Sequence, residues 1–239
     1  MSILHTDQVF APVDRDHTME RVAGGNETEV YRTDDGGHVV KLKSDLGADI
    51  ALVLVEARKM RAAAEQFALC LGPRHSIPNA YLIARDDTGR VQILVIQPFL
   101  QGTRPLHDLD YARLSEEQRA SVATQLRDII RRALDFYHAN GSMPDLYGRT
   151  SSSSAERARL NGLFMLPWRL WSFVVGRNLL RSHNLMLTGG PNQQVVLVDY
   201  DIVRRGWLYR QLYYAVRWLL FWRDHVLILL MRYGRVFPR

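Results

Sequence analysis

The stretch from residue 20 to residue 43 restricts the fold more than any other part of the chain, because it combines two strands with a tight glycine turn. Residues 29–33 alternate polar and apolar side chains, which favours a strand, and residues 38–43 are a second stretch rich in β-branched residues. Between them lies Asp34-Asp35-Gly36-Gly37, a typical hairpin turn, since glycine adopts a positive φ at little cost. The sequence therefore predicts an antiparallel hairpin.

Two features of this stretch favour phosphate binding. Gly24 and Gly25 precede the hairpin and let the backbone bend sharply, so that backbone amides can cover phosphate groups while the ammonium of Lys41 neutralises their charge. The chain has 3 lysines against 28 arginines, and two of the three lie in this strand. The glycine pair alone is also typical of a plain turn, so Lys41 carries the hypothesis.

Residues 51–102 are predicted to form one helix, two more strands and a linker. Residues 51–67 lack Gly and Pro and are rich in Ala, Leu, Glu and Arg, which predicts a helix that contains Glu56. Residues 79–84 and 91–96 are strand-like. Residues 97–102 then read as a linker, so we expect a domain boundary near Gly102.

The second part is predicted to be helical at first, with a short hairpin after it. Residues 114–140 are an amphipathic helix, and the loop that follows contains Asp145. A serine run at residues 151–154 opens an apparent insert over residues 149–181. Residues 183–188 and 195–198 form a hairpin that carries Asn184 on its first strand and ends in Asp199. An amide and a carboxylate oxygen placed so can bind Mg²⁺ together.

This order of elements, over about residues 20–202, resembles the protein-kinase-like fold in its compact bacterial branches. These include the aminoglycoside phosphotransferases, the RIO-type kinases and the lipopolysaccharide core sugar kinases. The resemblance implies an α+β bilobal fold, with a small antiparallel β N-lobe over residues 1–102 and a helical C-lobe over residues 103–239. It also implies a kinase that uses ATP and Mg²⁺ to phosphorylate a hydroxyl of a small, sugar or lipid-linked acceptor.

The resemblance also implies roles for individual residues. Gly24, Gly25, Lys41 and its helix partner Glu56 would hold the nucleotide phosphates, and Gln97 and Phe99 belong to a hinge whose backbone would hold the adenine. Asp145 resembles the catalytic base. Asn184 and Asp199 resemble the two Mg²⁺ ligands.

One spacing departs from these families. In them the catalytic Asp and the metal-binding Asn lie five residues apart, whereas Asp145 and Asn184 are 39 apart. Either an insertion leaves Asp145 in place, or Asp145 is not the base. Asn178 is a second candidate for the metal-binding amide. A degenerate site, in a pseudokinase-like nucleotide-binding or membrane-associated adaptor, is the alternative.

Charge is distributed unevenly along the chain. Residues 1–148 carry 17 basic and 21 acidic residues, whereas residues 149–239 carry 14 arginines and 4 acidic residues. We expect a basic helix rich in Trp and Arg over residues 203–235, with Arg210, Arg217 and Asp224 on one face. This pattern fits either a core helix with a solvated arginine stripe or a helix that rests on an anionic membrane surface. Nucleic acid is not expected as a partner, because no motif for it is present.

The cellular compartment is predicted from two features that the sequence lacks, a pair of cysteines and a targeting or membrane-spanning segment. A single cysteine, Cys70, cannot form an intrachain disulfide, which favours a reducing compartment. A signal peptide is not predicted, because residues 1–17 lack a basic segment followed by an apolar one. A membrane-spanning segment is not predicted either, because charges such as Arg169 and Arg217 interrupt the apolar stretches. We therefore expect a cytoplasmic protein, peripheral at the inner membrane if it binds lipid.

Overall fold

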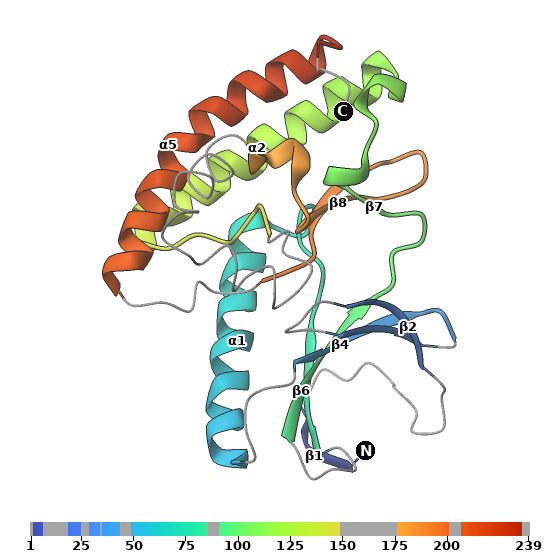
Figure 1. Cartoon of the computed structure of the whole chain (residues 1–239), viewed down its shortest axis with the longest axis vertical. Helices are drawn as coiled ribbons and strands as arrows, with labels where there is room; N and C mark the ends of the chain where they lie inside the picture. Colours follow the sequence, from blue (N-terminus) through green and yellow to red (C-terminus); the bar gives the residue numbers. More distant parts are fainter. Residues whose placement is uncertain are drawn as a thin grey trace, which may run out of the picture. The chain divides into compact units, whose positions relative to one another are not determined.

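The computed structural model describes residues 2–6, 19–24, 29–33, 35–43, 49–85, 91–148, 176–200 and 207–235. Within these ranges the chain is a mixed α+β protein with two antiparallel sheets and three α-helices (Figure 1). It divides into two compact units. The first contains the described residues up to Glu65 and Ile77–Phe99, and the second contains Gln66–Ser76 and the described residues from Leu100 onward.

The first unit is built on a six-stranded sheet in which every pair of neighbouring strands is antiparallel. In spatial order its strands are β1 (Ser2–Thr6), β5 (Ala80–Arg85), β6 (Val91–Pro98), β4 (His38–Lys43), β3 (Glu29–Thr33) and β2 (Met19–Gly24). The predicted hairpin is confirmed, since β3 pairs with β4. Gly36 supplies the positive φ of its turn, and the Gly36 N–H donates to the Thr33 carbonyl at 2.8 Å.

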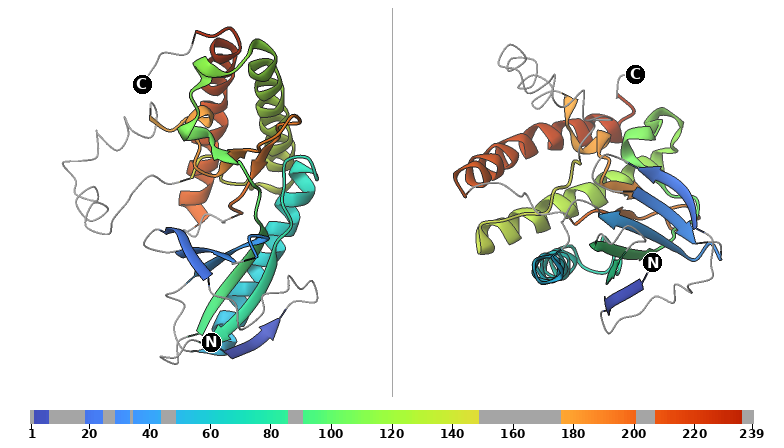
Figure 2. Two further views of the ribbon diagram at one scale, coloured as in Figure 1. Left: turned by 90° about the vertical axis from the view of Figure 1, so that its right-hand side faces the viewer. Right: turned by 60° about the horizontal axis from the view of Figure 1, so that its bottom comes forward.

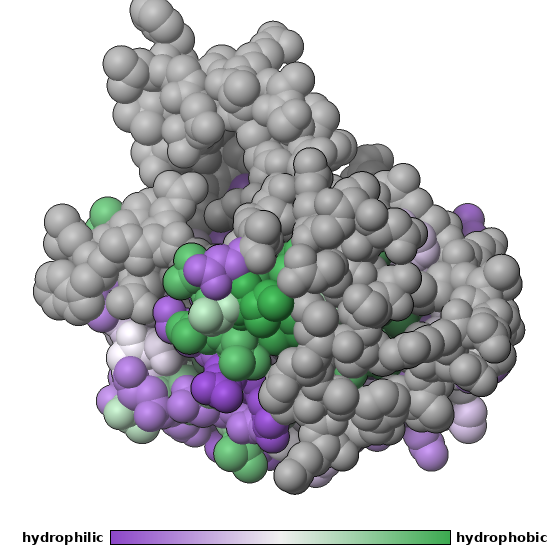
Figure 3. Space-filling view, turned by 90° about the horizontal axis from the view of Figure 1, so that it is seen from below, coloured by the Kyte–Doolittle hydropathy of each residue, from purple (hydrophilic) through white to green (hydrophobic). Residues whose placement is uncertain are grey.

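Helix α1 (Ile50–Leu71) begins in the first unit. One face of it is buried, because Val53, Ala57 and Met60 recur at helical spacing. Its first turns also expose Ile50 and Leu52. Figure 3, which looks from below at the end where α1 begins in Figure 1, shows apolar side chains at the surface beside hydrophilic ones.

The second unit contains two long helices that pack side by side, α2 (Glu116–Asn140) and α5 (Trp207–Arg232) (Figures 1 and 2). Helix α2 begins with a capping box between Ser115 and Gln118 and ends at Gly141, whose φ is 65°. This agrees with the helix predicted over residues 114–140.

A small sheet completes the second unit. Its three antiparallel strands are β7 (Arg104–Pro105), β8 (Leu185–Leu187) and β9 (Val195–Leu197), so the predicted hairpin of β8 and β9 is confirmed. Three short 3₁₀ helices connect these parts: η1 (Leu106–Asp108), η2 (Tyr111–Arg113) and η5 (Leu179–Arg181). Among the described residues, no helix combines the length and apolarity needed to cross a membrane.

Candidate functional site

The loop that carries Asp145 is joined directly to Asn184, the residue that precedes β8. The amide nitrogen Nδ2 of Asn184 donates to the backbone carbonyl of Asp145 at 2.8 Å. The hydroxyl of Ser182 donates to the Leu146 carbonyl at 2.6 Å, and the backbone N–H of His183 donates to the Tyr147 carbonyl at 3.0 Å. The structure therefore brings Asp145 and Asn184 together although 39 residues separate them in sequence.

Gly148 makes this close approach sterically feasible. Its φ is 74°, and a Cβ atom built there would lie 2.5 Å from Oδ1 of Asn184 and 3.0 Å from the Cβ of His183. A side chain at position 148 would collide with Asn184, so this position needs glycine for space as well as for conformation.

Asn184 and Asp199 lie at the same end of the β8–β9 hairpin. Leu185 pairs with Leu197, and one step further the backbone N–H of Val198 donates to the Asn184 carbonyl at 2.9 Å. Asp199 follows Val198 directly and is partly buried. Because Nδ2 of Asn184 already donates to Asp145, its amide oxygen is the atom that remains to ligate a cation.

Asn178, the other candidate for a metal-binding amide, has a different role. It lies at the N-terminus of η5, where its Oδ1 accepts a hydrogen bond from the Arg181 N–H at 3.1 Å. This is a helix cap, and it uses one of the two lone pairs of that oxygen. The described part of the chain holds no group of three or more His, Cys, Asp or Glu side chains suited to a metal ion.

The Asp145 carboxylate is held by two hydrogen bonds to one of its oxygens. The backbone N–H of Tyr147 donates to Oδ1 at 3.1 Å, and the Tyr213 hydroxyl donates to the same atom at 3.2 Å. Burial raises the pKa of Tyr213, and the negative charge of Asp145 raises it further. The phenol therefore stays protonated at neutral pH and acts as a donor.

Arg217 lies against the rings of Tyr147 and Tyr213. Its guanidinium carbon is 3.8 Å from the Tyr147 ring centroid and 5.0 Å from that of Tyr213, which is cation–π geometry. The side chain is 1% exposed. Burial opposes its charge, but Tyr213, Tyr147 and Asp145 together raise the pKa of Arg217, so it stays cationic beside the Asp145 loop.

Asp224 anchors the other side of Tyr147. The Tyr147 hydroxyl donates to its Oδ2 at 2.6 Å, and Nη2 of Arg223 donates to its Oδ1 at 2.8 Å. Asp224 is 1% exposed, and burial raises its pKa although Arg223 and Tyr147 counteract this. The loop of Asp145 is thus tied to α5 by two tyrosines, Tyr147 from the loop and Tyr213 from the helix.

The expectation of a solvent-facing charged stripe on α5 is wrong. Arg217 and Asp224 do share one face, but that face is turned into the protein. The side chain of Arg210 lies outside the described side chains. Helical spacing groups residues on one face and does not say which face is buried. Arg217 and Asp224 have opposite charges and lie seven residues apart, which was the only sequence signal that they could be buried together. Sequence reasoning did not use this signal, and it therefore also missed their partners Tyr147 and Tyr213.

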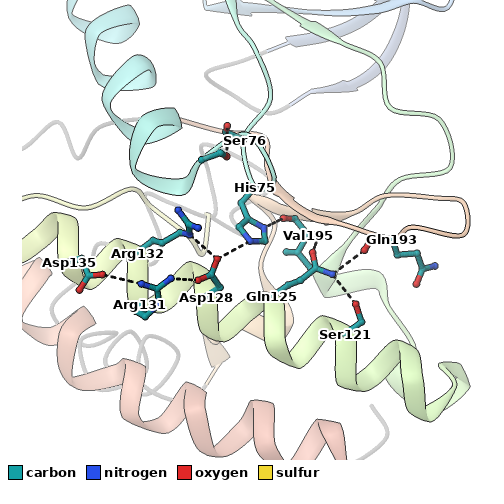
Figure 4. Close-up of polar contacts among 11 residues, drawn as sticks. His75, Ser76, Ser121, Gln125, Asp128, Arg131, Arg132, Asp135, Gln193 and Val195 are labelled. Carbon is teal, nitrogen blue, oxygen red and sulfur yellow. Dashed lines mark hydrogen bonds and ion pairs between the residues drawn. The ribbon is translucent and has the colours of Figure 1, made fainter.

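Strand β9 is held from two sides, and this positions Asp199 beyond its end. Nδ1 of His75 donates to the Val195 carbonyl at 2.8 Å, while Oε1 of Gln125 accepts from the Val195 N–H at 2.8 Å. Figure 4 shows these contacts around Val195, together with the carboxylate of Asp128, whose Oδ2 lies 3.4 Å from Nε2 of His75. His75 follows α1 in the chain, and Gln125 and Asp128 belong to α2.

The residues predicted to hold the nucleotide belong to the first unit. Lys41 lies on β4 opposite Val30 and Val95, and Glu56 lies on α1; both side chains are partly buried and have interaction partners. Gly24 is the last residue of β2, and Gly25 lies outside the described residues.

Gln97 and Phe99, the residues predicted to form the hinge, both make contacts within the first unit. Nε2 of the buried Gln97 donates to Oδ1 of Asn79 at 2.5 Å. The backbone N–H of Phe99 donates to the Gly37 carbonyl at 2.8 Å, and the guanidinium of Arg32 lies 5.3 Å from its ring centroid. The Phe99 N–H is therefore already used, so an adenine would have to be bound by other backbone groups of this stretch.

Comparison with known proteins gives little guidance. No family model matches this chain. A search of the curated proteins finds no match either. Among solved structures, the chain is similar to one titled "Glucosamine kinase (crystal form B)", at 15% sequence identity and a TM-score of 0.32, over 96% of this chain and 70% of that chain. A similarity this low assigns neither a fold nor an activity to the chain.

Proposed function

We propose that this chain is a phosphotransferase of the protein-kinase-like type that uses ATP and Mg²⁺, with its two units as the N-lobe and the C-lobe. The observation that supports this most is the hydrogen bond from Asn184 to the Asp145 carbonyl. It joins the loop of a catalytic carboxylate to the hairpin of two oxygen ligands, as the resemblance implies. The long insertion between them therefore does not argue against Asp145 as the base.

The donor atoms fit Mg²⁺. Asp199 offers a carboxylate and Asn184 an amide oxygen, which are the hard oxygen ligands that Mg²⁺ prefers. Bound there, Mg²⁺ would neutralise charge on the ATP phosphates. In the first unit, Lys41, supported by Glu56, and the glycine loop at Gly24 and Gly25 would hold nucleotide phosphates, and the backbone near Gln97 and Phe99 would hold the adenine.

Asp145 acts as the general base in this proposal. The acceptor hydroxyl gives its proton to the carboxylate, and its oxygen forms a bond to the γ-phosphorus as the bond to the bridging oxygen breaks and ADP leaves. Both hydrogen bonds to the carboxylate go to Oδ1. We therefore assign the proton transfer to Oδ2, with Tyr213 and the Tyr147 N–H holding the orientation of the group.

The acceptor in this proposal is the hydroxyl of a small molecule, a sugar or a lipid-linked compound. The resemblance to compact bacterial sugar and aminoglycoside kinases supports this class. We place the chain in the cytoplasm, where its lone cysteine would stay reduced. A peripheral position at the inner membrane would bring it to a lipid-linked acceptor.

Nucleotide binding by the full chain tests the proposal at its first step. We expect Lys41→Met to weaken Mg²⁺-dependent ATP binding at least tenfold by calorimetry, because it removes a phosphate-binding cation. Lys59→Met is the matched control, since Lys59 is an exposed lysine on α1. Equal affinities of the wild-type chain and the Lys41→Met variant would refute the assignment of Lys41. ATP binding without turnover in any acceptor assay would instead identify a non-catalytic nucleotide-binding module.

A further inference from the structure

The outward face of α5 is apolar over residues 211–231. Between residues 211 and 231, every exposed position of this helix carries an apolar side chain, and the remaining positions are partly or fully buried. From Trp218 onward the large ones recur three or four residues apart, apart from the adjacent pair Trp218 and Leu219, and Leu212 lies six residues before them. Together they form what we call the apolar stripe: Leu212, Trp218, Leu219, Trp222, Val226 and Leu229. Trp222 is 71% exposed and Leu219 is 63% exposed.

On α5 the usual distribution of side chains on a surface helix is reversed. A helix on the surface of a soluble domain ordinarily buries its apolar side chains and turns its charges to water. Here Arg217 and Asp224 are buried against Tyr147, while the two tryptophans face outward. Continuous exposed apolar patches of this kind mark interaction sites.

The charged residues of this segment indicate which kind of partner binds the apolar stripe. Asp224 is the only acidic residue in residues 203–239, and its burial leaves no exposed carboxylate on the described part of this segment. Arg232 and Arg235 are exposed at the end of the helix. In a second copy of the chain, laid stripe to stripe, the described part of this segment would offer Arg232 and Arg235 no exposed carboxylate to pair with. Anionic lipid headgroups supply the missing negative charge, and tryptophan favours the membrane–water interface.

We propose that the apolar stripe of α5 docks the protein on a bilayer that contains anionic phospholipid. The helix would lie in the plane of the interface over about 39 Å, from its 26 residues at the usual helical rise. The stripe would enter the boundary between headgroups and acyl chains, and Arg232 and Arg235 would contact the headgroups. This surface deepens the peripheral membrane position named in the proposed function, but it does not depend on phosphotransferase activity, because none of its residues belongs to the candidate site.

Vesicle sedimentation of the full chain, without nucleotide, tests this. We expect the wild-type chain to bind vesicles of 70% phosphatidylcholine and 30% phosphatidylglycerol at least tenfold more tightly than vesicles of phosphatidylcholine alone. The double substitution Leu219→Glu and Trp222→Glu should weaken that binding at least tenfold. Leu69→Glu is the matched control, because Leu69 is an 82% exposed leucine on α1 and should bind as the wild type does.

Three outcomes would overturn the docking surface. The first is no sedimentation of a wild-type chain that is folded by circular dichroism. The second is equal binding to neutral and anionic vesicles, or equal binding by the wild type and the glutamate variant. The third is a dimer in analytical ultracentrifugation that the glutamate variant abolishes while vesicles bind neither, which would assign the stripe to a second copy. Trp222→Gln, a milder change, should weaken binding in the same direction if the double variant unfolds.

Discussion

Tyr213 donates to the same oxygen of Asp145 that accepts the Tyr147 N–H, and this shared contact limits how the carboxylate can turn. A side chain from α5 therefore orients a loop residue 68 positions earlier in the chain. Burial keeps the Tyr213 phenol protonated by raising its pKa, and the charge of Asp145 acts in the same direction. Tyr213 is thus a positioning residue for the proposed base.

Removing this hydroxyl should slow turnover more than it weakens binding. We expect Tyr213→Phe to lower kcat about tenfold, the equivalent of about 1.4 kcal/mol, with little change in the KM for ATP. Tyr233→Phe, at an exposed tyrosine, is the matched control. A Tyr213→Phe variant with unchanged kcat would show that the hydrogen bond does not position the carboxylate.

Gly148 offers a second test at the scale of one residue. Gly148→Ala places a Cβ 2.5 Å from Oδ1 of Asn184, whereas Gly190→Ala, at a similar φ of 88°, meets nothing within 4 Å. Both variants bear the cost of a positive φ, about 1 kcal/mol. We expect Gly148→Ala to lose about 1–3 kcal/mol more in the free energy of unfolding by urea titration. Equal losses would mean that Asn184 moves aside freely.

At the scale of elements, α2 serves as the support on which β9 rests. Gln125 and Asp128 are one turn apart on this helix, so the first reaches Val195 and the second reaches His75, which itself bonds Val195 (Figure 4). Asp128 also accepts hydrogen bonds from Arg131 and Arg132. These contacts hold β9 in position, and Asp199 lies two residues after the end of that strand.

The Asp128 contacts predict a loss of stability in acid. Partial burial works against ionisation, but hydrogen bonds and charge from Arg132 and Arg131 lower the pKa of Asp128 to about 2. Because this is below its ordinary value of 3.8, the stabilisation is complete above about pH 4 and disappears as the pH falls toward 2. We expect it to be about 1 kcal/mol, given that the carboxylate is partly exposed to solvent.

Urea titrations of the wild type and of Asp128→Asn measure this contribution. The difference in unfolding free energy between them should be largest above pH 4 and should shrink between pH 4 and pH 2. Asp135→Asn is a suitable control, because Asp135 is more exposed and its ion pair with Arg131, on the same helix, is longer at 3.6 Å. A difference that stays constant over this pH range would contradict the role of the ion pairs.

At the scale of the whole molecule, sequence reasoning succeeded where the signal was local. Gly36 predicts the β3–β4 hairpin, and the amphipathic pattern over residues 114–140 predicts α2, because turns and helices of this kind are determined by residues close in sequence. The contact between Asn184 and Asp145 was not predictable from spacing alone, since it closes across 39 residues. The burial of Arg217 depends on two distant tyrosines for the same reason.

Transfer of the ATP γ-phosphate to sugar and lipid-linked hydroxyl acceptors by the full chain tests the central proposal most directly. We predict Mg²⁺-dependent transfer that falls at least a thousandfold in Asp145→Asn and in Asp199→Asn, while Asp135→Asn, with a 67% exposed side chain, keeps the wild-type rate. Transfer that proceeds equally well in the Asp145→Asn and Asp199→Asn variants would contradict the proposal.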